Sequence, residues 1–260
     1  MISAGVDGGS RAIKVVLLDC RTRKVLASGV CDQGVDHDGL ARKLLEQLLK
    51  KADLARSRIV RLVATGYTRN AIGFADTTVT EITCHAAGVR HRMPKAATII
   101  EIGGQDSKLL RLNPDGSVRD FAMNDRCAAG TGRFLEVVAA RLNAGLEGLG
   151  DLARAASSPA PISSMCVVFA ETEIIGLLAS GARPEDIVAG VQASIASRVA
   201  AMVGRGAKAP VVFTGGVAMI PGMADALAAA LKTPVQIAPD PQMTGALGAA
   251  ILACRQACGK

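Results

Sequence analysis

The sequence predicts an α/β protein built from two duplicated lobes, and a repeated pattern is the main evidence. At residues 2–18 and again at residues 98–112, an apolar stretch runs into a Gly-Gly turn and a lysine leads the next apolar stretch. A third apolar stretch ends in Gly-Gly at residues 211–217. Apolar runs that end at glycine turns are typical of strands and hairpins. Copies so far apart in the chain indicate duplicated lobes rather than a solenoid of short repeats.

Strands in the first lobe are expected where short apolar runs are bounded by turn residues. These runs lie at residues 2–6, 12–18, 25–30 and 58–64. A helix is expected at residues 40–51, because leucines recur there at helical spacing.

The second lobe shows the same alternation of short runs and longer periodic stretches. Its expected strands are residues 98–102, 109–112 and 211–217, and its expected helices are residues 134–142, 167–178 and 223–231. An alanine-rich helix at residues 245–254 is expected to return to the first lobe. The first lobe therefore comprises residues 1–93 plus 242–260, and the second comprises residues 94–241.

Composition limits the classes of function. The chain has 260 residues, of which 50% are hydrophobic and 20% charged, so it can bury a sizeable core. It has five Phe, one Tyr and no Trp, so a nucleic-acid binder that relies on base stacking would lack its platforms. The net charge of +7 fits an anionic ligand such as a nucleotide, or an acidic partner, or simply a mixed solvated surface.

The chain has seven Cys, and no basic stretch followed by a long apolar run opens it. No other apolar stretch long enough to span a membrane is expected. We therefore expect a cytoplasmic protein in a reducing compartment, where thiols act as core residues, catalysts or metal ligands more readily than as disulfides.

The glycine turns have the chemistry of a phosphate site. Two glycines let backbone amides approach an anion without Cβ obstruction. Asp7 and Asp106 offer the oxygen ligands that Mg²⁺ prefers, and Ser10 and Lys14 offer a donor and a positive charge to phosphates. One Asp-Gly-Gly is most often a simple hairpin turn, but two echoing turns and a third favour function. A Gly-x4-Gly-Lys-Ser/Thr loop is absent from the sequence, which disfavours a P-loop enzyme.

Cys127 and Cys166 each precede an expected helix, and Glu171 and Glu173 lie in the first turns of the second one. Backbone amides at a helix start stabilise a thiolate or the charge of a cluster. A zinc site or a four-iron cluster normally needs four protein ligands, so such a site here would require two chains on a two-fold axis. The alternative is that both thiols are small buried side chains, and spacing alone leaves both readings open.

The other cysteines are expected to have ordinary structural positions. Cys20 and Cys31 lie in strands or at strand ends, and Cys254 and Cys258 occupy solvent-side helix positions. Cys84 and His85 are expected to be a packed pair under a helix.

Two motifs resemble those of a known family. The segments NDRCAAGTGRFL at residues 124–135 and SSMCVVFAETE at residues 163–173 closely resemble the cluster motifs of the activators of 2-hydroxyacyl-CoA dehydratases, also called component A. These activators belong with the benzoyl-CoA reductase ATPase subunits. The similarity covers essentially the whole chain through further motifs at residues 64–69, 81–86, 102–106, 214–217 and 245–249.

The resemblance implies the actin/Hsp70/sugar-kinase fold, with a cleft between the lobes that binds ATP or ADP and Mg²⁺. Its catalytic residues would be Asp7, Gln105 and Asp106. The matching positions for the nucleotide are Ser10, Arg11, Ala12, Ile13 and Lys14 in the first loop, Gly103 and Gly104 in the second, and Gly215, Gly216 and Gln242 on the nucleoside side. Arg11 stands where the family usually has Thr, and residues 219–221 depart from the more polar run usual there.

The resemblance also implies a homodimer with one 4Fe–4S cluster held by Cys127 and Cys166 of both subunits. The reduced cluster would give a low-potential electron to a partner 2-hydroxyacyl-CoA dehydratase, coupled to ATP hydrolysis. The electron donor would be reduced ferredoxin or flavodoxin, in an anaerobic cytoplasm, with no nucleic acid or membrane involved.

Three alternatives remain open at this point. An ATPase subunit of a benzoyl-CoA-type reductase would pair with a sister chain. A small-molecule kinase with incidental thiols would bind no iron and would phosphorylate a hydroxyl group. A redox sensor with a cluster would show negligible ATP turnover.

Overall fold

The structure contains two five-stranded sheets that share one strand order. The first sheet has the order β3-β2-β1-β4-β5, and the second has the order β10-β9-β6-β7-β8. In each sheet the central strand, β1 or β6, pairs antiparallel with the next strand and parallel with the fourth strand of that sheet. The repeated glycine-turn pattern of the sequence therefore reflects a duplicated sheet topology, as predicted.

The computed structural model describes residues 1–163, 166–204 and 206–259. The chain divides into two compact units. The first unit comprises Met1–Ala96, Leu112–Arg119 and Ala238–Lys260, and the second comprises Ala97–Arg111 and Asp120–Ile237. Unlike the predicted lobes, these units assign residues 112–119, which join two strands of the second sheet, to the first unit.

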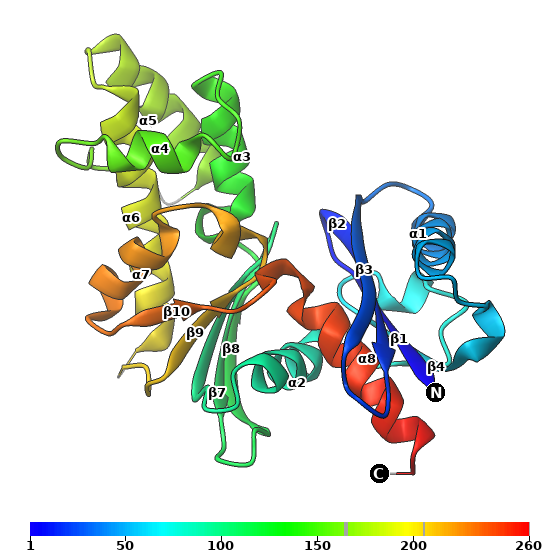
Figure 1. Cartoon of the computed structure of the whole chain (residues 1–260). Helices are drawn as coiled ribbons and strands as arrows, with labels where there is room; N and C mark the ends of the chain where they lie inside the picture. Colours follow the sequence, from blue (N-terminus) through cyan, green and yellow to red (C-terminus); the bar gives the residue numbers. More distant parts are fainter. Residues whose placement is uncertain (164–165, 205, 260) are drawn as a thin grey trace. The chain divides into compact units, whose positions relative to one another are not determined.

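The first unit places helices on both faces of its sheet (Figure 1). Its strands are β1 (Ile2–Gly8), β2 (Ala12–Asp19), β3 (Val25–Asp32), β4 (Ile59–Thr65) and β5 (Thr77–Thr78), and its helices are α1 (His37–Lys51), α2 (Glu81–Arg92) and α8 (Thr244–Ala257). Asp36 begins α1 by accepting a hydrogen bond from the Gly39 amide, and Lys50 and Lys51 lie in its last turn.

Strand β2 is apolar on both sides because both faces of the first sheet are covered. Ile13, Val15 and Leu17 pack in the cluster that contains the leucines of α1, whereas Val16 and Leu18 pack in the cluster formed with α8. Successive side chains of a strand point to opposite faces, so a strand covered on both sides needs a continuous apolar run.

Helices α2 and α8 approach each other through glycines. A Cβ atom on Gly88 would lie 2.0 Å from the Thr244 carbonyl oxygen, and one on Gly248 would lie 1.7 Å from the Cys84 carbonyl oxygen. Real Cβ atoms do not approach carbonyl oxygens this closely, so both positions require glycine.

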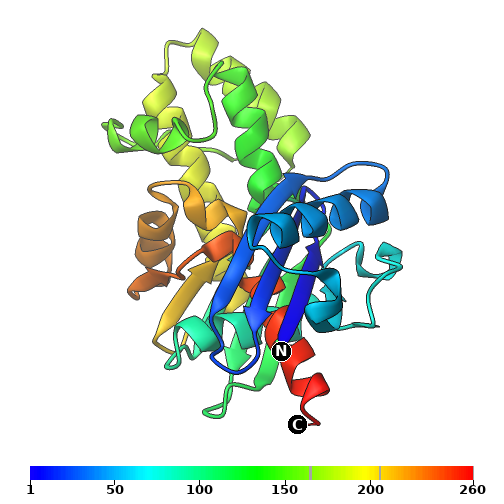
Figure 2. The same ribbon diagram turned by 45° about the vertical axis from the view of Figure 1, so that its right-hand side comes forward.

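The helices of the second unit contribute to one apolar cluster that includes β6, β7 and β9. Figure 2 shows the ribbon of this unit from a second direction. The strands are β6 (Thr98–Ile102), β7 (Ser107–Leu112), β8 (Val118–Asn124), β9 (Val211–Thr214) and β10 (Val235–Ile237). The helices are α3 (Gly132–Arg141), α4 (Leu149–Arg154), α5 (Val167–Ala179), α6 (Pro184–Val203) and α7 (Met223–Leu231).

Helix α6 differs from the expectation that no apolar stretch reaches membrane-spanning length. It is the one described helix long and apolar enough to cross a membrane by length and composition, and 50% of its most apolar window is buried. Its residues Ile187, Val191, Ile195 and Val199 belong to the core of the second unit. This burial explains the apolar composition of α6 as that of a core helix.

Two cysteines that were expected to be unpaired form a disulfide in the first unit. Cys20 follows β2 and Cys254 lies in α8, with their Cα atoms 5.4 Å apart. The prediction that Cys254 faces solvent is wrong: its exposed fraction is 0%, because this side of α8 packs on the sheet. Cys258 is exposed, as predicted, and Cys31 lies half-buried in β3.

Candidate functional site

The first glycine turn joins β1 to β2, and hydrogen bonds fix its backbone. The Gly9 amide donates to the Ala12 carbonyl over 3.1 Å, and the Thr68 amide donates to the Gly8 carbonyl over 2.8 Å. Gln33 Nε2 donates to the Gly9 carbonyl over 2.7 Å. Gln33 was not singled out from the sequence, and Thr68 was noted only as part of the motif at residues 64–69, with no role in holding this turn.

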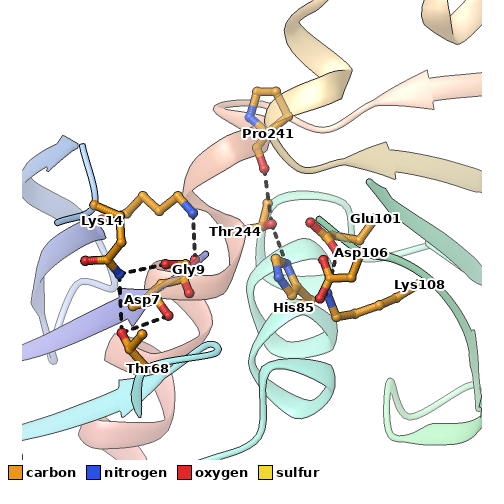
Figure 3. Close-up of polar contacts among 12 residues, drawn as sticks. Asp7, Gly9, Lys14, Thr68, His85, Glu101, Asp106, Lys108, Pro241 and Thr244 are labelled. Atoms are coloured by element: carbon orange, nitrogen blue, oxygen red, sulfur yellow. Dashed lines mark hydrogen bonds and ion pairs between the residues drawn. The ribbon is translucent and has the colours of Figure 1, made fainter. Parts of the chain in front are cut away.

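A carboxylate and an ammonium group face each other beside this turn. Asp7 and Lys14 are register partners on β1 and β2, and Lys14 Nζ lies 3.4 Å from Asp7 Oδ2. Asp7 is 5% exposed, whereas the Lys14 side chain is 18% exposed. A Cβ atom on Gly9 would lie 2.8 Å from Lys14 Nζ, so the ammonium group points at the glycine turn (Figure 3).

The other predicted residues of the first loop fall at its tip and in β2. Ser10 is half-buried and Arg11 is exposed, whereas Ala12 and Ile13 begin β2 with Ile13 fully buried. Ile13 thus contributes its backbone rather than its side chain to the loop.

The second glycine turn joins β6 to β7 and contains a buried ion cluster. Lys108 Nζ lies 2.9 Å from Glu101 Oε2 and 2.8 Å from Asp106 Oδ2 (Figure 3). Lys108 is 1% exposed and Glu101 is 5% exposed. Gly103 donates to the Asp106 carbonyl over 2.9 Å and so closes the turn, while Gln105 is exposed at its tip.

The sequence pattern matched Asp7 with Asp106, but the strand register matches Asp7 with a different residue of the second sheet. Glu101 is paired with Lys108 across β6 and β7, as Asp7 is paired with Lys14 across β1 and β2. Glu101 is therefore the counterpart of Asp7 in the duplicated sheet, and Asp106 lies in the turn. The equal spacing from carboxylate to lysine in the two copies is the signal that would have found Glu101 in the sequence.

The third glycine turn lies at the end of β9, beside Glu101. Gly215 has a φ of 92°, and a Cβ atom there would lie 2.3 Å from the Ile102 carbonyl oxygen and 2.7 Å from Glu101 Oε1. Only glycine fits this position. Gly216 is exposed and starts a 3₁₀ helix, Gly216–Met219.

A buried histidine lies near Asp7 in the first unit. His85 Nδ1 is 2.9 Å from Thr244 Oγ1, and the Thr244 hydroxyl donates to the Pro241 carbonyl over 3.3 Å (Figure 3). A Cβ atom on Gly245 would lie 3.0 Å from Asp7 Oδ2 and 3.2 Å from His85 Cε1. The two side chains therefore flank the start of α8.

Two neighbours of this histidine complete the predicted set in the first unit. Gln242 is half-buried in the 3₁₀ helix Pro241–Met243. Cys84 is buried, as expected, and burial raises the pKa of its thiol to about 12.

Both predicted metal-ligating cysteines belong to the second unit. Cys127 is half-buried and precedes a 3₁₀ helix, Ala128–Gly130, so α3 starts several residues further on than the cysteine. Cys166 is exposed at the N-cap of α5, as the helix-start prediction requires. Ser164 and Met165 of the second cysteine motif lie outside the described residues.

Within the described part of the chain, no group of three or more His, Cys, Asp or Glu side chains is placed to hold a metal ion.

Two backbone hydrogen bonds join the second glycine turn to the start of α3. The Gly132 amide donates to the Gly103 carbonyl over 2.9 Å, and the Arg133 amide donates to the Gly104 carbonyl over 2.8 Å. The helix that follows Cys127 is thus attached directly to the second predicted phosphate loop.

A cavity of about 850 Å³ lies elsewhere in the first unit, between α2, α8 and residues 115–118. Its charged lining includes Arg23, Arg90, Arg255 and Asp115. None of the predicted site residues line it.

Two units of one topology, each with a glycine turn and a carboxylate–lysine pair at its central strand, define the actin/Hsp70/sugar-kinase class. The ethanolamine utilization protein EutJ from Carboxydothermus hydrogenoformans superimposes with a TM-score of 0.64 at 19% identity, over 96% of this chain and 90% of that one. A ROK hexokinase from Thermus thermophilus gives 0.53 at 16% identity, with 100% of both chains covered. These likenesses show the fold alone.

The chain belongs to the BadF/BadG/BcrA/BcrD ATPase family, whose model matches residues 4–253. It is 44% identical to the activator of lactoyl-CoA dehydratase from Anaerotignum propionicum, over 97% of both proteins. It is 40% identical to the (R)-2-hydroxyglutaryl-CoA dehydratase activating ATPase from Acidaminococcus fermentans, again over 97% of both.

A solved structure, the activator of the 2-hydroxyisocaproyl-CoA dehydratase from Clostridium difficile with bound ADPNP, superimposes with a TM-score of 0.94. The two sequences are 43% identical, and the match covers 100% of this chain and 96% of that one. The resemblance to the dehydratase activators is confirmed.

Proposed function

We propose that the chain is an ATP-dependent electron donor that activates a 2-hydroxyacyl-CoA dehydratase. The observation that carries the proposal is the pair of hydrogen bonds from Gly132 and Arg133 to the second glycine turn. They attach the helix after Cys127 to a predicted phosphate loop. A change in that loop on ATP hydrolysis is thereby transmitted to the cysteine as a rigid shift of α3.

The nucleotide binds to the glycine turns of both units. Backbone amides of Ser10, Arg11, Ala12 and Ile13, with the ammonium group of Lys14, hold phosphate oxygens. Gly103 and Gly104 approach the phosphates in the same way, and Gly215, Gly216 and Gln242 contact the nucleoside. The buried carboxylate of Asp7 and the turn carboxylate of Asp106 suit Mg²⁺, because this cation prefers oxygen ligands and keeps several waters. Gln105, exposed at the turn, orients the attacking water.

The iron–sulfur cluster belongs to a homodimer. A 4Fe–4S cluster takes four thiolates, and Cys127 and Cys166 supply two from each subunit. When bound, the cluster supplies the low-potential electron. Cys166 lies at the N-cap of α5, where the positive end of the helix favours the negative charge of a bound cluster.

An exposed apolar face on α5 supports the dimer. Val168 is 66% exposed and Phe169 is 68% exposed, immediately after Cys166. Exposed apolar side chains that lie next to each other are typical of interaction sites. A second copy of the chain covers this face and brings its own cysteines to the cluster.

The names of the relatives support one further partner, a 2-hydroxyacyl-CoA dehydratase, which accepts the electron. We further propose that reduced ferredoxin or flavodoxin replaces the electron, in an anaerobic cytoplasm. The ATPase subunit of a benzoyl-CoA-type reductase is the alternative, and it would require a sister chain in place of the second copy.

Anaerobic purification with iron and sulfide analysis tests the proposal. About four iron and four sulfide per homodimer are expected, together with ATP hydrolysis. Cys127→Ser or Cys166→Ser should abolish the cluster and leave nucleotide binding largely intact. Absence of iron with phosphorylation of a hydroxyl acceptor would instead identify a kinase. A cluster with negligible ATP turnover would identify a redox sensor.

A further inference from the structure

The two register-equivalent lysines have different surroundings. Lys14 Nζ lies 3.4 Å from Asp7 Oδ2, and the Lys14 side chain is 18% exposed. Lys108 Nζ lies 2.9 Å from Glu101 Oε2 and 2.8 Å from Asp106 Oδ2, and the Lys108 side chain is 2% exposed. A duplicated fold therefore carries the same cross-strand pair in two forms, one facing the glycine turn and one enclosed.

We propose that Lys108 is a positioning residue: its buried ammonium group fixes the carboxylates of Glu101 and Asp106, and it does not bind phosphate. Lys14 is then the lysine that contacts the nucleotide. The nucleotide-binding arm of this inference rests on the proposed function, whereas the unfolding arm does not.

The charge balance of the cluster explains why both carboxylates depend on Lys108. Glu101 is 5% exposed, so its charge needs a partner within the protein. Two carboxylates close together repel each other unless a cation lies between them. Lys108 occupies that position and offsets one of the two negative charges, while the carboxylate oxygens remain the kind of ligand that Mg²⁺ prefers.

Glu101 also connects the cluster to two glycine turns. A Cβ atom on Gly103 would lie 3.3 Å from Glu101 Oε1, and one on Gly215 would lie 2.7 Å from the same oxygen. When Lys108 holds the other carboxylate oxygen of Glu101, it also fixes the side chain against which both turns pack. The ammonium group thus orders Asp106 directly and the turns through Glu101.

The test compares one substitution at the two equivalent positions. ADP affinity is measured by calorimetry in EDTA and in Mn²⁺, and thermal unfolding is followed without nucleotide. Lys14→Met should weaken ADP binding under both conditions and change the unfolding temperature little. Lys108→Met should leave ADP affinity in EDTA unchanged. The increase in ADP affinity that Mn²⁺ produces should be about tenfold smaller in this variant than in the wild type. Lys108→Met should also lower the unfolding temperature by about 5 °C or more.

A second variant covers the case in which Lys108→Met does not fold. The double variant Glu101→Gln/Lys108→Met removes one charge of each sign and so restores the balance of the buried pair. The double variant should fold. Mn²⁺ should still raise its ADP affinity much less than that of the wild type, because Asp106 has lost its ion pair with Lys108. The proposal would be overturned if Mn²⁺ raised the ADP affinity of the double variant as much as that of the wild type. It would also be overturned if Lys14→Met and Lys108→Met changed ADP affinity in EDTA and in Mn²⁺ in the same way.

The two proposals fail in distinguishable ways. If the wild-type chain bound no nucleotide, the proposed function would be overturned. The unfolding comparison between Lys14→Met and Lys108→Met would still decide the role of Lys108, since it needs no nucleotide.

Discussion

Asn124 and Cys127 exchange two hydrogen bonds: the Cys127 amide donates to Asn124 Oδ1 over 3.1 Å, and Asn124 Nδ2 donates to the Cys127 carbonyl over 2.8 Å. A side chain that holds both backbone groups of one residue fixes the position of the backbone that carries its thiol. Residues that orient metal ligands typically change metal affinity ten- to a hundredfold, which is roughly the effect expected here.

Asn124→Ala should therefore speed the loss of iron to a chelator by about tenfold while leaving the ATPase rate largely unchanged. Iron release is followed at the chelator's absorbance band in anaerobic, reconstituted protein. Asn113→Ala is the control, because Asn113 holds Ser117 in a hairpin of the first unit. Equal release rates in the two variants would exclude a role for Asn124 in holding the cluster.

Phe169→Asp should weaken the homodimer by at least about tenfold, because it places a charge on the apolar face of α5. Sedimentation of the apoprotein over a range of concentrations measures the dissociation constant. Val35→Asp, at a side chain that is 99% exposed, is the matched control. A dimer unaffected by Phe169→Asp would mean that the second copy binds elsewhere.

Gly248→Ala should destabilise the protein by about 3 kcal/mol or more, because the new Cβ would overlap the Cys84 carbonyl oxygen. Gly176→Ala is the control within another helix, α5, where a Cβ atom meets nothing within 4 Å. That change should be neutral or stabilise by up to about 1 kcal/mol through helix propensity. Urea unfolding measures both, and equal stability of the two variants would contradict the close approach of α2 and α8.

The pKa of Cys84 predicts how stability depends on alkaline pH. Burial raises this thiol's pKa from 9.0 to about 12, so the folded state retains a proton that the unfolded state releases. The contribution is fully present below pH 9 and is lost as the pH rises from about 9 to about 12. The slope should be at most about 1.4 kcal/mol per pH unit. Cys84→Ala should reduce this slope, and a slope unchanged in that variant would assign the effect to other groups.

Hydrophobic pattern and turn chemistry were enough to predict most strands and several helices. The α7 range, Met223–Leu231, matches the prediction, and β6 does too. Helices α2 and α6 were not predicted as elements, because periodicity fades when a helix is covered on several sides. Helix α6 buries residues around most of its circumference, so it shows no polar stripe.

Candidate residues that stand beside a sequence pattern were easier to select than residues defined by the fold. Asp7, Cys127 and Cys166 stand beside glycines or helix starts, which sequence patterns mark. Glu101 and Asn124 were missed as site residues because their importance depends on strand register and on hydrogen bonds. The Cys20–Cys254 disulfide was missed for a related reason, since only the fold brings residues so distant in the chain together.

Helix α8 covers one face of the first sheet, but it is translated after all the other helices described above. Strand β2 therefore waits for its partner while most of the chain is translated, which takes on the order of ten seconds or longer. During that interval Val16 and Leu18 lack the helix that buries them in the finished protein. All residues of the second unit, by contrast, lie between Ala97 and Ile237, so they are translated before α8. Strand β2 is thus buried on its α8 side only after the second unit has been translated, and until then it presents an apolar face of the kind that chaperones shield.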